Sequence, residues 1–237
     1  MYIPPLIETY LTDKHELISV SENVLGINKN IEELIKDLSQ KSKQMVVISG
    51  LSGVGKDTLA NIMMEKIPKL RRVRTSTTRP RRPEESPDAD PYNRVSFDEF
   101  WQMVRNGETL EYVEYAGNLY CTSYKFINEV FDSGQIPLIK LDPVGARSFL
   151  QMWRGKENIF KDVSPLYYFI VADNIQELRE RLVKRRTAPK IIDERIDQDH
   201  KDLELVEDAQ YIVINKTDMQ EVVAGEMVDI LTKLSVK

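Results

Sequence analysis

One nine-residue stretch, GLSGVGKDT from Gly50 to Thr58, constrains the fold of this chain more than any other. The run Met-Val-Val-Ile at 45–48 comes just before it, and such short apolar, β-branched runs are typical of buried strands. Apolar residues then recur at helical spacing over 59–67. The stretch is therefore a turn from a strand into a helix, and chains built from such units fold as α/β proteins.

The same stretch has the chemistry of a phosphate-binding loop. Gly50, Gly55 and Lys56 match the pattern GxxxxGK[ST] up to its last position. Glycines let backbone N–H groups curl round a polyphosphate, the helix N-terminus adds partial positive charge, and the lysine reaches the outer phosphates. A Gly-rich turn without a ligand is the alternative, but strand, glycines, lysine and helix together favour the phosphate site. Asp57 departs from the pattern, since Ser or Thr would contact Mg²⁺ there, and Thr58 follows it.

The composition limits the class of protein. A chain of 237 residues, 41% of them hydrophobic, can bury a full core as one large domain or as one domain with an appendage. A net charge of −5 argues against a protein that coats nucleic acid. The single cysteine excludes an internal disulfide. No signal-peptide pattern and no apolar run of the ~20 residues that cross a bilayer is present. We expect a soluble, cytoplasmic protein with neither a membrane nor a nucleic-acid partner.

Residues 1–44 precede the phosphate-loop strand and are expected to form an N-terminal helical extension to a main domain at 45–237. Between Asn28 and Lys43, apolar side chains repeat at the spacing of an amphipathic helix, at Ile31, Leu34, Ile35 and Leu38. We expect this helix to pack on the main domain, and a contact with a partner or a second copy is the alternative. The sequence does not define an oligomeric state.

Strands are expected at 45–49, 71–75, 137–142, 166–171 and 209–214, and they alternate with helical patterns along the chain. This alternation predicts a five-stranded parallel sheet with helices on both faces. A small antiparallel excursion interrupts it. Ser96 and Glu99 form the capping box of a helix, and the alternating segments 110–115 and 119–122 flank a turn at Gly117.

The segment 69–82 carries seven basic residues and no acidic one, namely Lys69, Arg71, Arg72, Arg74, Arg79, Arg81 and Arg82. In an acidic protein, such a cluster concentrates positive potential on an anion, and arginine forks bind phosphate oxygens in pairs. A nucleic-acid patch is disfavoured because no aromatic residues interleave to stack on bases. A solvated surface run remains the alternative.

From about residue 45 to 234, the chain resembles the guanylate kinase family. Two motifs carry the resemblance: TTRxxR at 77–82, and an element similar to GNxYGTS at 117–123, in which Cys121 replaces a glycine. The resemblance implies a P-loop kinase fold with a small mixed α/β lobe for GMP at about 76–123 and a helical lid at about 184–195. It implies ATP-dependent phosphorylation of GMP to GDP, with ATP and GMP as partners and Mg²⁺ accompanying ATP.

The resemblance also implies the roles of individual residues. It places ATP on the phosphate loop, on Gly50, Leu51, Ser52, Gly53, Val54, Gly55, Lys56, Asp57 and Thr58. It places GMP on a second set of side chains, Thr75, Arg79, Arg82, Tyr92, Glu111, Tyr120, Thr122 and Asp142. The implied catalytic residues are Lys56, Arg79, Arg185 and Arg195, of which the last two lie in the lid, and the implied metal contacts are Thr58 and Asp57.

The chemistry of the base agrees with the implied role of Glu111. Guanine presents adjacent N1–H and N2–H donors that one carboxylate can accept, whereas adenine N1 is an acceptor and would repel it. A kinase of the same fold with another acceptor, such as ribose 1,5-bisphosphate, is a rival function, but a sugar needs neither Glu111 nor Thr122. A non-catalytic guanylate-kinase-like binding module is a second rival, against which the intact loop with Lys56 argues.

One departure from the family pattern pairs with another. Two residues before Asp142 the family usually has an acid, and this chain has Lys140. Since Asp57 adds a carboxylate at the loop, Lys140 and Asp57 are hypothesised to have exchanged charge between the two positions and roughly preserved the local sum.

Overall fold

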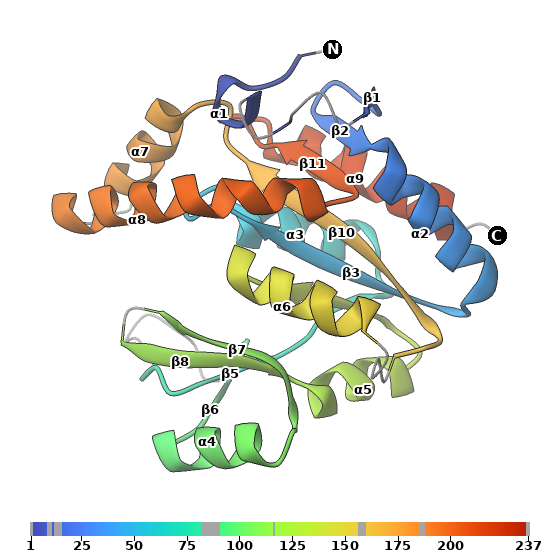
Figure 1. The fold of residues 1–237 in the computed structure, drawn as a ribbon, viewed down its shortest axis with the longest axis vertical. Helices are drawn as coiled ribbons and strands as arrows, with labels where there is room; N and C mark the ends of the chain where they lie inside the picture. Colours follow the sequence, from blue (N-terminus) through green and yellow to red (C-terminus); the bar gives the residue numbers. More distant parts are fainter. Residues whose placement is uncertain are drawn as a thin grey trace.

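A large sheet and a small sheet organise the molecule (Figure 1). The computed structural model describes residues 2–8, 11, 16–81, 91–115, 117–155, 160–184 and 188–235. The large sheet has the strand order β1–β2–β11–β10–β3–β9–β4. Five neighbouring strands run parallel, namely β11 (Tyr211–Ile214), β10 (Val163–Val171), β3 (Lys43–Gly50), β9 (Ile136–Lys140) and β4 (Leu70–Arg72). The predicted five-stranded parallel sheet is confirmed.

A hairpin that the sequence did not predict extends the large sheet at one edge. β1 (Leu17–Ser19) pairs antiparallel with β2 (Val24–Ile27), and β2 pairs antiparallel with β11. All four residues of β2 are buried. The N-terminal segment therefore contributes strands as well as the expected helix, α2 (Asn28–Gln40), whose Ile31 and Leu34 lie in the main core.

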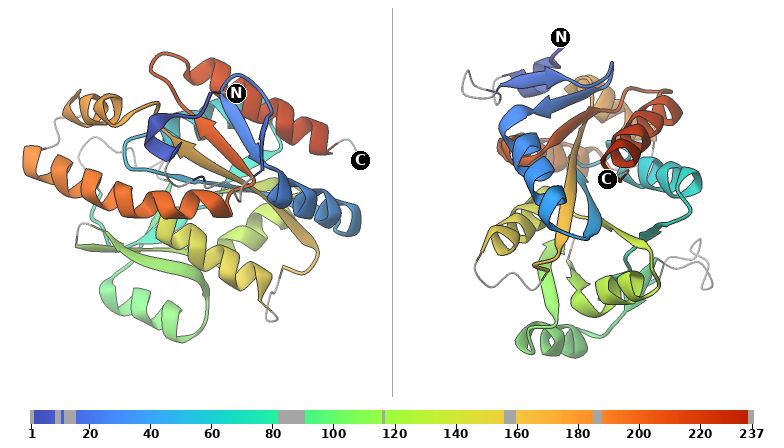
Figure 2. Two further views of the ribbon diagram at one scale, coloured as in Figure 1. Left: turned by 45° about the horizontal axis from the view of Figure 1, so that its top comes forward. Right: turned by 90° about the vertical axis from the view of Figure 1, so that its right-hand side faces the viewer.

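Helices cover both faces of the large sheet (Figures 1 and 2). On one face lie α2, α6 (Pro143–Arg154) and α8 (Pro189–Asp202), and on the other lie α3 (Lys56–Lys66) and α9 (Gln220–Ser235). The short α1 (Pro5–Glu8) precedes the β1–β2 hairpin. Because both faces are covered, the central strands are apolar without alternation, and all nine residues of β10 are buried.

The small sheet forms a separate layer beside α6 (Figure 1). Its strand order is β6–β5–β8–β7, with bounds β6 (Tyr92–Arg94), β5 (Thr75–Thr77), β8 (Asn118–Ser123) and β7 (Thr109–Tyr115). The predicted hairpin is β7–β8, and the predicted capping box at Ser96 and Glu99 opens α4 (Phe97–Arg105). Phe100 of α4 packs with buried residues of β8 in a second small core. This lobe therefore has a mixed α/β structure of its own.

The single strand expected at 71–75 is wrong, because the chain divides this segment between the two sheets. β4 ends at Arg72, and the Val73 N–H still donates to the Leu138 carbonyl of β9 at 2.9 Å. Thr75 then begins β5 and pairs with Thr122 of β8. The basic segment thus connects the phosphate-loop sheet directly to the small sheet.

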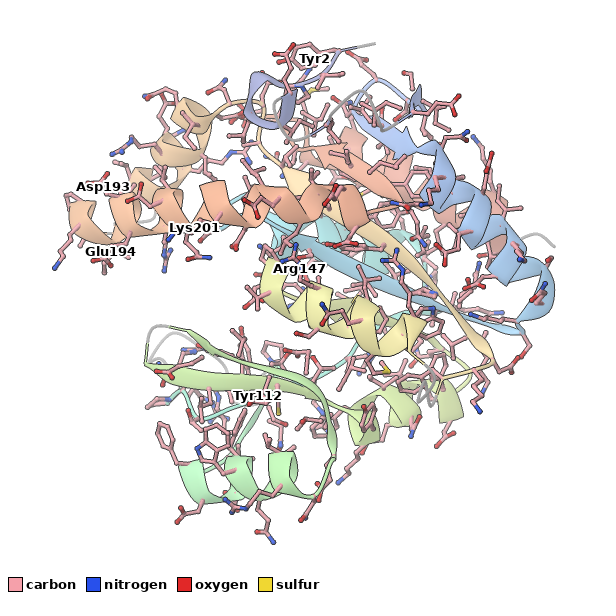
Figure 3. The ribbon with its side chains drawn as sticks, in the orientation of Figure 1. Tyr2, Tyr112, Arg147, Asp193, Glu194 and Lys201 are labelled. Atoms are coloured by element: carbon pink, nitrogen blue, oxygen red, sulfur yellow. The ribbon has the colours of Figure 1, made fainter. Side chains whose placement is uncertain are left out.

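Two helices, α7 (Ile175–Lys184) and α8, project together from one edge of the large sheet (Figure 1). They share a small apolar core of Leu182, Ile192 and Ile196. Arg179 of α7 also pairs with Asp193 of α8 at 2.7 Å, at the end of α8 that lies farthest from the sheet (Figure 3). The remaining elements are α5 (Tyr124–Asp132) and the 3₁₀ helix η1 (Leu203–Asp208). In the part of the chain that the structure describes, no helix is long and apolar enough to cross a membrane.

Candidate active site

The phosphate loop joins β3 to α3 as predicted, and two of its glycines are required by its shape. Gly50 has a φ of 133°, and a Cβ there would lie 2.0 Å from the carbonyl oxygen of Ile170. Gly55, the N-cap of α3, has a φ of 93°. Side chains rarely adopt such positive φ values, so only glycine fits the backbone at both positions. The helix N-terminus that follows directs its free N–H groups into the loop.

Lys56 lies inside this loop. Its Nζ donates to the carbonyl oxygens of Gly50 at 2.6 Å and Leu51 at 2.8 Å. Burial, helped by the neighbouring charge of Lys140, lowers the pKa of Lys56 to about 8. The ammonium group is therefore fixed where the backbone curls, as a lysine that binds outer phosphates requires.

Two side chains from segments distant in the sequence bind the Val54 carbonyl oxygen of the loop. Asn215, just after β11, donates through Nδ2 to the Val54 carbonyl oxygen at 2.6 Å. Arg181 of α7 donates to the same oxygen at 3.2 Å and pairs with Glu177 at 2.7 Å. Arg181 could not be identified from the sequence, because a lone arginine in a helical pattern resembles any residue of a solvated helix face.

Asp199 of α8 also contacts the loop, and no pattern in the sequence pointed to it. Its Oδ1 accepts a hydrogen bond from the Ser52 backbone N–H at 2.8 Å, and the residue is 3% exposed. Its Oδ2 is buried without a hydrogen-bond partner among the described residues. Burial raises the pKa of Asp199 to about 7 despite the Ser52 hydrogen bond. A carboxyl group thus occupies a loop amide that could otherwise bind a phosphate oxygen.

We expect Asp199→Asn to tighten the binding of ADP by about three- to tenfold at pH 8 and to change it little at pH 6. Asparagine keeps an acceptor for the Ser52 N–H, while the ionised aspartate repels phosphates above its pKa of about 7. Titration calorimetry across pH 6–9 would measure this. The weakening that deprotonation of Lys56 causes near pH 8 should persist in the variant, and an unchanged ADP affinity at pH 8 would contradict the expectation.

In the small sheet, three of the expected GMP residues lie in one row across neighbouring strands. Thr75 of β5 pairs with Thr122 of β8, and Thr122 pairs with Glu111 of β7. Glu111 is 7% exposed, and its Oε1 accepts the Thr122 N–H at 3.0 Å. Burial raises the pKa of Glu111 to about 7, and the neighbouring charge of Asp142 adds to this effect. A buried carboxylate with spare acceptor capacity is suited to a ligand that offers N–H donors.

Asp142 meets Glu111 at the N-terminus of α6. Asp142 is the N-cap, and its side chain accepts the Gly145 N–H at 2.6 Å. A Cβ on Gly145 would lie 3.0 Å from Oε2 of Glu111 and 3.2 Å from Oδ1 of Asp142. Gly145 therefore leaves space in which the carboxyl group of Glu111 from β7 and that of Asp142 from the start of α6 converge.

We expect Gly145→Ala to weaken GMP binding about 30-fold, because the added methyl group crowds both carboxyl groups. Such overpacking typically costs 1–3 kcal/mol, and about 2 kcal/mol corresponds to this loss of affinity. Helix stability should not fall, since alanine is the better helix former. Calorimetric titration with GMP would measure the loss, with binding of an ATP analogue as the control. A GMP affinity within about twofold of wild type would contradict this account of the site.

A cluster of arginine and tyrosine side chains lies where the second anion site is predicted. The Arg79 guanidinium lies 5.2 Å from the centre of the Tyr92 ring, and the Tyr92 and Tyr120 rings meet edge to face at 6.4 Å. Arg94, which the sequence analysis did not assign, lies 5.0 Å from the Tyr92 ring and donates to the Arg79 carbonyl oxygen at 2.7 Å. Arg94 follows Tyr92 by two residues on β6, so strand alternation could have placed both on one face.

Four other expected site residues either lie outside the described residues or lie on helices α8 and α3. Arg82 and Arg185 lie outside the described residues. Arg195 lies half-buried on α8, one turn before Asp199, and its charge lowers the raised pKa of that carboxyl group. Thr58 is exposed at the start of α3, and its role as a metal contact stays a prediction.

Asp57 and Lys140, which the sequence analysis linked by charge, are in direct contact. Lys140 Nζ lies 2.8 and 3.0 Å from the two carboxylate oxygens, and Arg72 Nη1 lies 3.0 Å from Oδ1. Mg²⁺ requires free oxygen ligands in octahedral geometry. Both Asp57 oxygens are already bound by cations, and no group of three metal-ligating side chains occurs among the described residues. The donor set does not fit a direct bond from Asp57 to a metal.

A parallel sheet, a phosphate loop that holds a lysine, and a small lobe that carries an arginine–tyrosine cluster are together typical of a P-loop nucleotide kinase. A family model described as "Guanylate kinase" matches residues 42–233. The chain belongs to the guanylate kinase family.

Individual relatives agree with this assignment. The guanylate kinase of Lactococcus lactis is 35% identical over 172 residues, which cover 72% of this chain and 79% of that protein. The guanylate kinase of Oceanobacillus iheyensis is 30% identical over the same shares of both chains. Among solved structures, guanylate kinase from Anaplasma phagocytophilum superposes with a TM-score of 0.61 at 25% identity and covers 83% of this chain and 88% of its own.

Proposed function

We propose that this chain transfers the γ-phosphoryl group of ATP to GMP and releases ADP and GDP. Membership of the guanylate kinase family supports the reaction. The observation that carries the choice of acceptor is the buried Glu111 carboxyl group, which lies beside Thr122 and converges with Asp142. A sugar bisphosphate offers no base edge to these groups. The intact loop around Lys56 favours an enzyme over a non-catalytic binding module.

We propose the site roles as follows. The loop 50–58, with Lys56 at its centre, holds the phosphates of ATP. The GMP phosphate binds Arg79, Arg82, Tyr92 and Tyr120 in the lobe at about 76–123, and the base binds Glu111, Thr122 and Asp142 beside Thr75. Arg185 and Arg195 of the lid at about 184–195 approach the transferred group. The GMP phosphate is already ionised near neutral pH, so positioning and charge stabilisation, and no general base, supply the rate.

Mg²⁺, the two nucleotides and the cellular location complete the proposed function. We propose that ATP enters with Mg²⁺ bound to its own phosphates, where the metal neutralises charge. Asp57 is left in its ion pairs and takes no part as a ligand. ATP and GMP are the proposed partners, and the proposed location is the cytoplasm.

The test is a measurement of ADP release with GMP, AMP, UMP and ribose 1,5-bisphosphate as acceptors. We expect turnover with GMP to exceed that with the other acceptors by about 10²-fold or more, since the site is built to accept guanine N–H donors. Faster turnover with the sugar bisphosphate would overturn the choice of acceptor. Absence of turnover with all four, together with binding of GMP, would favour a binding module.

A further inference from the structure

Three charged side chains meet beside the phosphate loop, and we refer to Asp57, Lys140 and Arg72 as the Asp57 cluster. They come from the start of α3, the end of β9 and the end of β4. β9 and β4 are neighbouring strands, so their two cations reach the carboxylate from the same edge of the sheet. Lys140 binds both carboxylate oxygens, at 2.8 and 3.0 Å, and Arg72 binds one at 3.0 Å.

The cluster is a fixed arrangement. Its cations are largely covered, with 25% of the Lys140 side chain and 19% of the Arg72 side chain exposed. A further hydrogen bond, from Arg72 Nη2 to Asn61 Oδ1 at 3.2 Å, orients the guanidinium. Although burial opposes it, Lys140 and Arg72 lower the pKa of Asp57, so the carboxylate stays ionised near neutral pH. Two cations and one anion leave a net positive charge next to the loop.

The charge of this cluster reaches the loop lysine. Lys140 is, after burial, the largest cause of the lowered pKa of Lys56. Two lysines therefore place positive charge at the loop: Lys56, which backbone carbonyls hold, and Lys140, which Asp57 holds.

We infer that Lys140, positioned by Asp57, supplies next to the phosphate loop the positive charge that a protein-bound divalent cation would otherwise supply, so that nucleotide triphosphate binding here depends little on Mg²⁺. This inference rests on the proposed function only in that the loop binds a nucleotide triphosphate. Asp57 acts as a positioning residue for Lys140, and the Lys140 ammonium group attracts the phosphates electrostatically.

The experiment compares the affinity of the full chain for AMP-PNP, a non-hydrolysable ATP analogue, in Mg²⁺ and in EDTA by titration calorimetry. For the wild type we expect the two dissociation constants to agree within about threefold. For the double variant D57S/K140E, which places a hydroxyl at 57 and an acid at 140, we expect Mg²⁺ to tighten binding by about tenfold or more. The charge-matched control is Lys66→Met, which removes a lysine from the far end of α3, where it pairs with Glu221.

Two results of this experiment would overturn the inference. Tightening of wild-type binding by about tenfold in Mg²⁺ would overturn the inference, as would equal Mg²⁺ independence of D57S/K140E, because the cluster would then not be its cause. Absence of AMP-PNP binding under both conditions would overturn the proposed function as well. Binding of GMP to the small lobe reports that each variant is folded. The single variant Lys140→Met should acquire Mg²⁺ dependence on its own, because it frees Oδ2 of Asp57, which only Lys140 binds among the described residues, while Arg72 keeps Oδ1.

Discussion

Replacing Lys56 with methionine is expected to lower kcat/KM for GMP phosphorylation by about 10³-fold, the largest effect of any single change outside the base site. Methionine keeps the side chain as far as Cε and removes the ammonium group that Gly50 and Leu51 hold in the loop. Charge that develops on the transferred phosphoryl group then lacks its fixed counter-charge. A coupled assay of ADP release measures the loss.

Two controls separate this chemical effect from a loss of structure. GMP binding should stay within about twofold of wild type, because Glu111 and Arg79 belong to the small sheet and its connection. Lys66→Met, at the other end of the same helix, should leave kcat/KM unchanged. Retention of more than about a tenth of the activity by Lys56→Met would show that the ammonium group is not the main source of charge stabilisation.

The sequence could predict the parts of this molecule that are specified locally. The phosphate loop, the capping box at Ser96 and the β7–β8 hairpin each depend on residues within about ten positions of one another, and all three are confirmed. Four of the five parallel strands, β3, β9, β10 and β11, were predictable for a related reason. Burial on both faces produces continuous apolar runs, which a single sequence displays without knowledge of the neighbours.

Features that depend on pairing between distant segments were not predictable in this way. β1 and β2 are three and four residues long, too short for a period-two pattern, and their place in the sheet is set by β11, almost two hundred residues later. The division of 71–75 between two sheets follows from a change of partner strand, from β9 to β8, that composition does not reveal.

The candidate site shows the same division. Asp57 and Lys140 were linked from sequence although 83 positions separate them, because both depart from a known pattern with opposite charges. Asp199 offered no such signal. An acid among several on a helix becomes notable only when the fold places α8 over the loop, with Asp199 on the Ser52 amide. Complementary charges can thus be paired from the sequence even when they lie far apart along the chain, whereas the packing of a helix on a loop cannot be inferred from the sequence.

Replacing Glu111 with glutamine is expected to lower kcat/KM for GMP by about 10²- to 10³-fold and to reduce the preference for GMP over AMP by a similar factor. The carboxylate can accept two guanine N–H groups, whereas the glutamine amide has one acceptor oxygen and would direct its own N–H₂ at a second donor. Glu114→Gln, an exposed acid on the same strand, is the matched control and should change neither value.

The pH dependence of GMP binding gives an independent test of the same residue. Burial raises the pKa of Glu111 to about 7, and guanine requires the ionised form as acceptor. As pH falls below 7, wild-type affinity for GMP should therefore drop by up to about tenfold per unit, because binding must release the proton. The GMP phosphate also titrates, near pH 6, but in wild type and Glu111→Gln alike. The ratio of the two dissociation constants isolates Glu111, and a ratio independent of pH between 5 and 8 would show that this carboxylate does not bind the base.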